Sequence, residues 1–278
     1  MRALIAGAGY VGTALAQQLV EKGHDVVLLR RSAVAPPSGA RAFRADLCAP
    51  GALDALAPAD WVFYTAAADE RSESAYRRAY VEGLARLIER LARMSLPPRL
   101  LFTSSTAVYG QQAGEWVDEA SPTEPSDFAG QRLLEGEALV RAAPLAGTVL
   151  RLGGIYGPGR GSLLERARAG ASGAPGYTNR IHRDDAAAAL LHLAALSQAE
   201  DVVIGVDSEP ARACEVLGWL AERLGLPAPR PAPEAPPSAR AARGSKRCRN
   251  ARLLATGFHF QYPTYREGYA ALLAEGAA

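Results

Sequence analysis

The chain has 278 residues, 49% of them hydrophobic, and its 31 lysines and arginines against 29 aspartates and glutamates give a formal net charge of +2. This length suits one large domain or two closely joined ones, with an ordinary globular composition. The small net charge excludes a broad cationic surface, so neither nucleic acid nor a membrane is expected as a partner. Only Lys22 and Lys246 are lysines, so arginine supplies nearly all of the positive charge.

Short apolar runs alternate with longer helical patterns along most of the chain. The strand-like runs are Ala3–Ala6, Val26–Leu29, Trp61–Thr65, Leu100–Thr103, Val149–Leu152 and Val202–Val206. Helices are predicted at Thr13–Glu21, Ser74–Met94, Arg132–Arg141 and Ala186–Leu196, where apolar residues recur every three or four positions. This alternation predicts an α/β fold, a Rossmann-like doubly wound parallel sheet covered by helices on both faces. Asp184 and Asp185 precede the last of these helices and are expected to cap it.

The pattern changes after about Asp207. A helix predicted at Ala211–Leu224 leads into the proline- and alanine-rich stretch Pro227–Pro237, which cannot hold regular structure. A basic segment and a last helix near Tyr265–Leu273 follow. We therefore predict a dinucleotide-binding Rossmann domain from residues 1–154 plus 180–206, and a smaller C-terminal substrate-binding lobe from residues 155–179 plus 207–278.

The basic segment carries six cations and no acid: Arg240, Arg243, Lys246, Arg247, Arg249 and Arg252. Two interpretations remain open. The segment can be a solvated basic loop, or it can clamp a phosphorylated ligand, because the planar fork of arginine donors matches a phosphate.

Cysteine and histidine usage indicates neither a disulfide framework nor a metal site. Cys48, Cys214 and Cys248 are odd in number and far apart, and the four histidines show no paired ligand spacing. No apolar run approaches the roughly 18 residues that a membrane-spanning helix needs. We expect a cytoplasmic protein that binds no metal.

A glycine motif, Gly7-Ala8-Gly9-Tyr10-Val11-Gly12, follows the first predicted strand and opens the first helix. Its glycines allow a tight turn, a close approach of the backbone to a pyrophosphate, and close packing of helix on strand. The helix N-terminus adds N–H donors and the positive end of its dipole. In this context the motif predicts a dinucleotide-binding site.

The end of the second strand bears on which dinucleotide binds. An acidic residue about 20 residues after the motif would hold the ribose hydroxyls of NAD. The sequence instead has Arg30, Arg31 and Ser32 there. Two guanidinium groups and a hydroxyl suit a 2′-phosphate, so NADP is favoured over NAD.

Later segments resemble the extended short-chain dehydrogenase/reductases, the NAD-dependent epimerase/dehydratase family. The matching segments, in family order, are Asp46-Leu47, Thr65-Ala66-Ala67-Ala68, Ser104–Gly110, Leu150–Leu152 with Ile155–Arg160, and Ile181–Asp185. The resemblance implies that Asp46, Leu47, Thr65, Ala66, Ala67 and Ser104 lie at the cofactor and that Ser105 is the catalytic serine. It also places Tyr156 and Arg160 in the loop that opens towards substrate, and the phosphate-clamp interpretation of the basic segment adds Arg247 as a substrate residue. Because relatives often dimerise, the resemblance makes a homodimer possible.

The sequence departs from the family at its catalytic pair. The family uses Tyr-x-x-x-Lys, in which the ammonium lowers the pKa of the tyrosine so that the phenol can exchange a proton with substrate. One register places Phe128 and Arg132 at these positions, and the better one places Ala129 and Leu133 there. With two lysines in the chain, no Tyr-x-x-x-Lys exists anywhere, so the resemblance is to atypical members.

Four side chains are candidates for the missing chemistry. Ser105 can hold a substrate oxygen or simply end a buried strand. Tyr80 replaces an asparagine usual in relatives, Tyr109 lies four residues beyond Ser105, and a packing role is the alternative for both. His182 can act as acid or base, or orient the turn before Asp184.

Two functions therefore remain open. The first is an NAD(P)-dependent oxidoreductase or epimerase acting on a hydroxyl or carbonyl compound, with a nucleotide-linked sugar as the leading substrate class. The second is a non-catalytic sensor that binds NAD(P) and reports its redox state to a partner.

Overall fold

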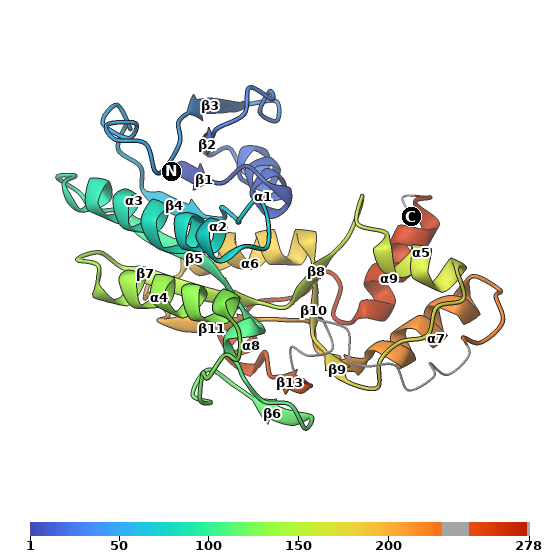
Figure 1. The fold of residues 1–278 in the computed structure, drawn as a ribbon. Helices are drawn as coiled ribbons and strands as arrows, with labels where there is room; N and C mark the ends of the chain where they lie inside the picture. Colours follow the sequence, from blue (N-terminus) through green and yellow to red (C-terminus); the bar gives the residue numbers. More distant parts are fainter. Residues whose placement is uncertain (230–244, 277–278) are drawn as a thin grey trace. The chain divides into compact units, whose positions relative to one another are not determined.

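The computed structural model describes residues 1–229 and 245–276, which form two compact units (Figure 1). The first unit comprises residues 1–108, 125–151 and 186–203, and the described residues of the second are 109–124, 152–185, 204–229 and 245–276. Residues 109–124 therefore belong to the second unit, whereas the sequence-based division placed them in the Rossmann domain.

A seven-stranded sheet forms the centre of the first unit, in the order β11-β7-β5-β4-β1-β2-β3. Its strands are β1 (Arg2–Ala6), β2 (Asp25–Arg30), β3 (Ala40–Arg44), β4 (Trp61–Tyr64), β5 (Arg99–Ser105), β7 (Gly147–Leu152) and β11 (Val202–Gly205). The pairs from β3 through β2, β1 and β4 to β5 are parallel. The order reverses between β1 and β4, which is where ligands bind in doubly wound sheets. The predicted fold class is confirmed.

The helices of the first unit match the predicted ones, with different bounds. They are α1 (Tyr10–Glu21), α2 (Glu73–Arg77), α3 (Gly83–Ala92), α4 (Phe128–Ala142) and α6 (Arg183–Ala195). The predicted single helix at Ser74–Met94 is interrupted by a π-helical turn, η1 (Arg78–Glu82), between α2 and α3. Helices α3 and α4 pack side by side (Figure 1).

Asp184 and Asp185 were predicted to precede and cap a helix, but the structure places both within the first turn of α6. Helix α6 begins at Arg183, before both residues. The buried carboxylate of Asp185 instead accepts hydrogen bonds from the backbone N–H groups of Gln261 and Tyr262, at 2.7 and 3.0 Å. Asp185 therefore anchors the chain before the last helix.

A buried ion pair joins α4 to the sheet. Glu137 is fully buried and Arg151, on β7, is 4% exposed. The arginine donates through two nitrogens to the two carboxylate oxygens, at 3.0 and 2.6 Å, and the Ser104 hydroxyl donates to the same carboxylate at 2.7 Å. The carboxylate is thus satisfied from both neighbouring strands, β5 and β7, which fixes the rotation of α4 against the sheet.

The second unit is built from short elements around a core rich in tyrosine. These elements are β6 (Glu115–Val117), β8 (Gly154–Tyr156), α5 (Ser162–Arg168), β9 (Tyr177–Thr178), β10 (Arg180–His182), β12 (Ala211–Arg212), α7 (Ala213–Arg223), β13 (Lys246–Cys248), α8 (Ala251–Ala255) and α9 (Tyr265–Ala274), and the 3-10 turn η2 (Thr106–Val108) ends the preceding stretch of the first unit. Tyr156 stacks on Tyr269 with ring centroids 4.6 Å apart, and Tyr265 is fully buried beside them.

Removing one partner of the Glu137–Arg151 pair leaves a buried charge uncompensated. We expect Arg151→Leu to lower the free energy of unfolding by about 3–5 kcal/mol. Urea titration followed by circular dichroism measures this. The matched control is Arg141→Leu, because Arg141 is 46% exposed and 3.5 Å from the same carboxylate; its cost should stay below about 1 kcal/mol. Equal losses of unfolding free energy in Arg151→Leu and Arg141→Leu would contradict the assignment of Glu137–Arg151 as a stabilising buried ion pair.

Asp207 gives the second unit a pH-dependent stability. It is 1% exposed; one carboxylate oxygen accepts the Glu209 backbone N–H at 3.2 Å, and the other has no partner among the described residues. Burial raises the pKa of Asp207 to about 8, against the opposing attraction of Arg180. An aspartate in the unfolded chain has a pKa of about 3.9. Between about pH 3.9 and pH 8 the folded state therefore holds a proton on Asp207 that the unfolded state has lost. The stability this proton provides is lost as the pH rises through about 8.

We therefore expect Asp207→Asn to flatten the fall in unfolding free energy between pH 5 and pH 9. The amide keeps the shape and cannot titrate. Urea titrations at several pH values give the slope. Asp118→Asn, in the same unit, is the control: hydrogen bonding by Ser121 lowers the pKa of Asp118, which is already ionised throughout this range. An unchanged slope in Asp207→Asn would refute the assignment.

Candidate functional site

The glycine turn after β1 is held against the turn after β4. Gly7 has φ +113°, a conformation that side chains other than glycine rarely adopt, and a Cβ there would overlap the Ala66 backbone. A Cβ on Gly12 would overlap the Gly7 carbonyl oxygen and the Thr65 hydroxyl. The Thr65 hydroxyl donates to the Gly7 carbonyl oxygen at 2.6 Å. Two of the three motif glycines are therefore required by packing within the protein.

Gly9 differs from the other two motif glycines. A Cβ built on Gly9 would meet no protein atom within 4 Å, and the residue is exposed at the N-terminus of α1, where it is the N-cap. The fold therefore does not require glycine there. Glycine at this position keeps the surface clear for a group approaching the N-terminus of the helix, as a pyrophosphate does. The cradle thus fits the predicted dinucleotide, with Tyr10 and Val11 opening α1.

The expected 2′-phosphate residues lie at the same edge of the sheet. Arg30 ends β2, its Nε donates to the Ser32 hydroxyl at 3.2 Å, and Arg31 and Ser32 are exposed. The Gly7 N–H donates to the Leu29 carbonyl oxygen at 3.1 Å, which joins this strand end to the glycine turn. Arg31 pairs with Asp69, and this carboxylate raises the pKa of the guanidinium.

The Asp46-Leu47 pair follows β3, where the resemblance places the adenine. One oxygen of the Asp46 carboxylate accepts the Cys48 backbone N–H at 2.9 Å and the other pairs with Arg78 at 2.6 Å. The Cys48 bond, with help from Arg78, lowers the pKa of Asp46. Asp46 and Leu47 are both half-buried. Because its carboxylate is bound by Cys48 and Arg78, Asp46 orders the loop and does not present a free charge.

The turn expected beside the cofactor, Thr65-Ala66-Ala67, starts directly after β4. Its first residue donates its backbone N–H to the Ala6 carbonyl oxygen at 2.8 Å, so β1 and β4 end together. Ala67 is exposed. The small side chains leave room over the strand ends, which the predicted ribose contact needs.

Ser104 and Ser105 end β5 and have different surroundings. Ser104 is 5% exposed and donates to Glu137, so it is part of the buried ion-pair network. Ser105 is half-buried, and its hydroxyl oxygen accepts the Ala107 backbone N–H at 3.2 Å. The hydroxyl proton of Ser105 remains able to donate to a substrate atom.

The structure shows what occupies the positions of the missing catalytic pair. In the better register these are Ala129 and Leu133, both on the buried face of α4, with 6% and 4% exposure. In the other register Phe128 packs edge-on against Tyr76, and Arg132 pairs with Glu135 at 2.6 Å. Neither register provides a phenol beside an ammonium.

Tyr80 lies in the π-helical turn η1, a feature common at functional sites. Its hydroxyl is hydrogen-bonded by the Ala68 backbone, and burial raises the pKa of Tyr80 to about 12, with Tyr76 adding to the rise. Its ring contacts Tyr76 at 5.2 Å between centroids. The phenol therefore lies beside the turn after β4 and stays protonated at neutral pH.

The remaining catalytic candidates lie in the second unit, where they are tightly packed. Tyr109 is 1% exposed and donates to the Asp118 carbonyl oxygen at 2.8 Å. His182 is 1% exposed, its Nδ1 accepts the Asp184 N–H at 3.2 Å, and burial lowers its pKa. Both side chains have the contacts of packing residues, and His182 orients the turn before Asp184.

The predicted substrate residues Tyr156, Arg160 and Arg247 all belong to the second unit. Tyr156 is 4% exposed and forms part of the tyrosine core, whereas Arg160 is exposed. Arg247 lies between two aromatic rings, 4.8 Å from Trp116 and 4.9 Å from Tyr177, and donates to the Gly114 carbonyl oxygen at 2.7 Å.

The described part of the basic segment, from residue 245 onward, contains a strand and is followed by a helix. Lys246–Cys248 form strand β13, parallel to β6, and Ala251–Ala255 form a helix. The Lys246 ammonium, 6% exposed, donates to the Tyr109 carbonyl oxygen at 2.8 Å. Arg240 and Arg243 lie outside the described residues.

Neither a metal site nor a membrane span is found in the described chain. Within residues 1–229 and 245–276 no three His, Cys, Asp or Glu side chains gather as metal ligands. Over the same residues no helix is both long and apolar enough to cross a membrane.

The two glycines Gly7 and Gly9 provide a matched test of the cradle. We expect Gly9→Ala to leave thermal stability almost unchanged and to weaken NADPH binding, because the new methyl group enters only the space reserved for the ligand. Gly7→Ala should instead destabilise the fold, since its Cβ overlaps Ala66. Thermal unfolding and NADPH fluorescence titration measure the two effects. Normal NADPH affinity in Gly9→Ala would place the pyrophosphate elsewhere.

Comparison with known proteins agrees with this geometry. The model of the NAD dependent epimerase/dehydratase family matches residues 3–205. A Streptomyces protein named 3-diazoavenalumate denitrifying reductase is 34% identical over 261 residues, covering 84% of this chain and 85% of the relative.

Two solved structures are similar over nearly the whole chain. An NAD-dependent epimerase/dehydratase from Methylobacillus flagellatus is 38% identical with a TM-score of 0.83, covering 100% of this chain and 99% of that one. Human epimerase family protein SDR39U1, solved with NADPH, is 26% identical with a TM-score of 0.78, covering 96% and 97%. The chain belongs to the NAD-dependent epimerase/dehydratase family.

Proposed function

We propose that this protein is an NADP-dependent reductase whose acceptor needs no proton from the protein during reduction. The observation that carries the proposal is the pair of buried apolar residues, Ala129 and Leu133, at the family's acid–base positions. The same chain has a dinucleotide cradle that is complete at Gly7, Gly9 and Gly12.

The chain's own residues supply binding and orientation. When the dinucleotide binds, the N-terminus of α1 would donate to its pyrophosphate, Arg30, Arg31 and Ser32 would hold its 2′-phosphate, and the turn after β4 would contact its ribose. The Ser105 hydroxyl donates a hydrogen bond that orients the acceptor. The bound dinucleotide, when reduced, supplies a hydride.

The missing pair restricts the choice of acceptor. Reduction of a carbonyl group leaves an alkoxide, which needs a proton, and an ammonium-assisted phenol normally provides it. Neither lysine can assist here, because Lys22 caps the end of α1 and Lys246 is bound to the Tyr109 carbonyl oxygen. An acceptor that is already cationic needs no such proton.

The name of the Streptomyces relative describes a substrate of this kind, a diazo compound that is reduced with loss of nitrogen. Its protonated form is a diazonium ion. Such an ion gains a carbon–hydrogen bond from the hydride pair while its carbon–nitrogen bond breaks and the bonding pair leaves with dinitrogen. The step consumes one reduced dinucleotide and no proton. We propose arenediazonium ions as the acceptor class.

A carbonyl substrate, including a nucleotide-linked sugar, is the competing acceptor. It would require Tyr80 or Ser105 as the proton source. The raised pKa of Tyr80 makes this phenol a weak acid, which disfavours rapid proton donation. A sensor without turnover is the remaining candidate, favoured by the absent pair alone.

We expect the purified protein to consume NADPH with a carboxylated arenediazonium salt, above the rate without protein, and to release dinitrogen. With NADPH deuterated at C4, deuterium should appear in the arene; in deuterated water with ordinary NADPH it should not. Mass spectrometry of the arene distinguishes the two sources. Turnover only with ketones, aldehydes or nucleotide sugars would refute the acceptor class.

Tyr80→Phe separates the mechanisms further. Diazonium reduction should be little changed in this variant, whereas a carbonyl reduction using the phenol should fall by about 10²–10⁴-fold. Absence of turnover with every acceptor, together with intact NADPH binding, would support the sensor and contradict the reductase.

A further inference from the structure

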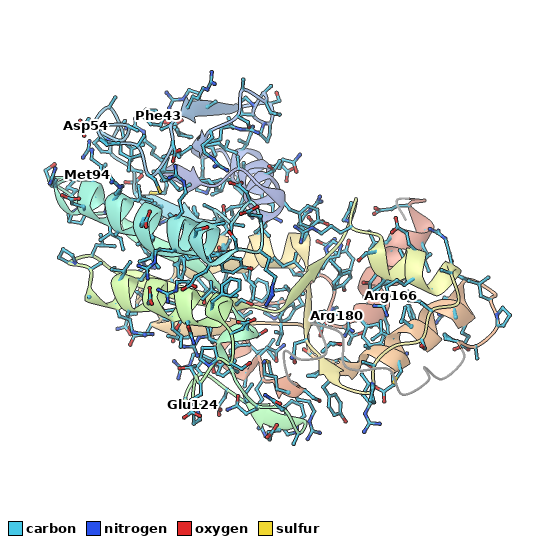
Figure 2. The ribbon with its side chains drawn as sticks, in the orientation of Figure 1. Phe43, Asp54, Met94, Glu124, Arg166 and Arg180 are labelled. Carbon is cyan, nitrogen blue, oxygen red and sulfur yellow. The ribbon has the colours of Figure 1, made fainter. Side chains whose placement is uncertain are left out.

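A third arginine lies at the carboxyl edge of the sheet, beside the two that the sequence analysis identified. Arg44 is the last residue of β3 and is the register partner of Arg30, the last residue of β2. Because the strands are parallel, partnered residues project from the same face of the sheet. Arg44 follows Phe43, which is labelled in Figure 2.

In the described part of the chain, no nearby carboxylate balances the positive charges of Arg30 and Arg44. Like charges directly opposite each other on paired strands are destabilising. The Nε of Arg44 donates to the Arg31 carbonyl oxygen at 3.2 Å, and that of Arg30 donates to the Ser32 hydroxyl. Within the described chain neither arginine has a carboxylate within ion-pair distance, so both charges remain available to an anion.

Arg31, the third guanidinium, is paired with a carboxylate that can be displaced. Its partner Asp69 lies just beyond the turn after β4, and the two side chains are 54% and 66% exposed. Ion pairs this exposed contribute little to stability. A dianionic phosphate offers more charge and more acceptor oxygens than this carboxylate does.

We propose that Arg44 is a third arm of the 2′-phosphate site, and that Asp69 holds Arg31 until the phosphate replaces it. This inference rests on the NADP dependence proposed above. Arg30, Arg31 and Arg44 then surround one phosphate from two strand ends, and the Ser32 hydroxyl adds a donor. The hydrogen bond from the Arg44 side chain to the Arg31 carbonyl oxygen couples the two strand ends, so phosphate binding orders both. Asp69 repels the phosphate unless it moves away, which makes it a determinant of affinity for NADP against NAD.

The test uses calorimetric binding of NADPH and NADH, and of adenosine 2′,5′-bisphosphate against 5′-AMP. We expect Arg44→Gln to weaken NADPH and the bisphosphate about tenfold or more, as loss of a charge-assisted contact does. NADH and 5′-AMP should bind as before. Arg44→Lys should rescue part of the loss, since it keeps the charge without the planar fork.

Arg41→Gln is the matched control on the same strand. Arg41 is the second residue of β3, three positions before Arg44, and it pairs at 2.7 Å with Asp25, which begins β2. Arg41 therefore lies away from the strand ends that carry Arg30 and Arg44. It should leave all four affinities unchanged. The dependence of NADPH affinity on salt should be less steep in Arg44→Gln than in Arg41→Gln, because one phosphate contact is lost.

Asp69→Asn tests the second half of the inference. Release of Arg31 should tighten NADPH binding about threefold, in line with the small energies of exposed ion pairs, and leave NADH unchanged. Weaker NADH binding in this variant would show that Asp69 holds the ribose instead, and would overturn its assigned role.

The outcomes separate this inference from the proposed function. If the native protein binds NADPH no more tightly than NADH, the NADP dependence fails and the inference fails with it. If NADPH is preferred but Arg44→Gln changes both dinucleotides equally, or neither, only the inference on Arg44 is overturned.

Discussion

At the point where the strand order reverses, the turn at Gly7 packs directly on the turn that follows β4. The Thr65 hydroxyl donates to the Gly7 carbonyl oxygen, and a Cβ at Gly7 or Gly12 would overlap the atoms in this contact. The contact fixes the start of α1 over the ends of β1 and β4. The direction of the helix N–H groups, the exposed surface at Gly9 and the nearness of the β2 end all follow from it.

The proposed cofactor site at this edge of the sheet and the family's acid–base positions on α4 lie on different elements. A family member can therefore lose the acid–base pair and keep the cofactor site. In the proposed function, cofactor recognition depends on backbone donors and on the arginines at the ends of β2 and β3, and none of these groups lies on α4. Helix α4 is held by the Glu137–Arg151 pair, so replacing its catalytic residues with Ala129 and Leu133 does not disturb the cradle. Binding and proton transfer are physically separable here, and the chain retains the first.

Local patterns in the sequence predicted the sheet and the glycine turn, because both depend on residues that are adjacent in the chain. The loss of the Tyr-x-x-x-Lys pair followed from counting the lysines. The π-helical turn at Arg78–Glu82 was missed, since the apolar spacing of 74–94 fits one continuous helix. Arg44 was missed for a different reason. Its significance comes from its register with Arg30 across two strands, and register is a property of pairing rather than of spacing along the chain. Tyr156 is buried although its motif suggested a substrate loop.

The proposed reduction proceeds without a proton from the protein. The most direct measurement is the single-turnover rate of diazonium reduction, with NADPH deuterated at C4 and, separately, in deuterated water. The account predicts a primary isotope effect from the deuterated NADPH and none from the solvent. A solvent isotope effect on the same step would contradict it, because a proton would then be moving in the transition state.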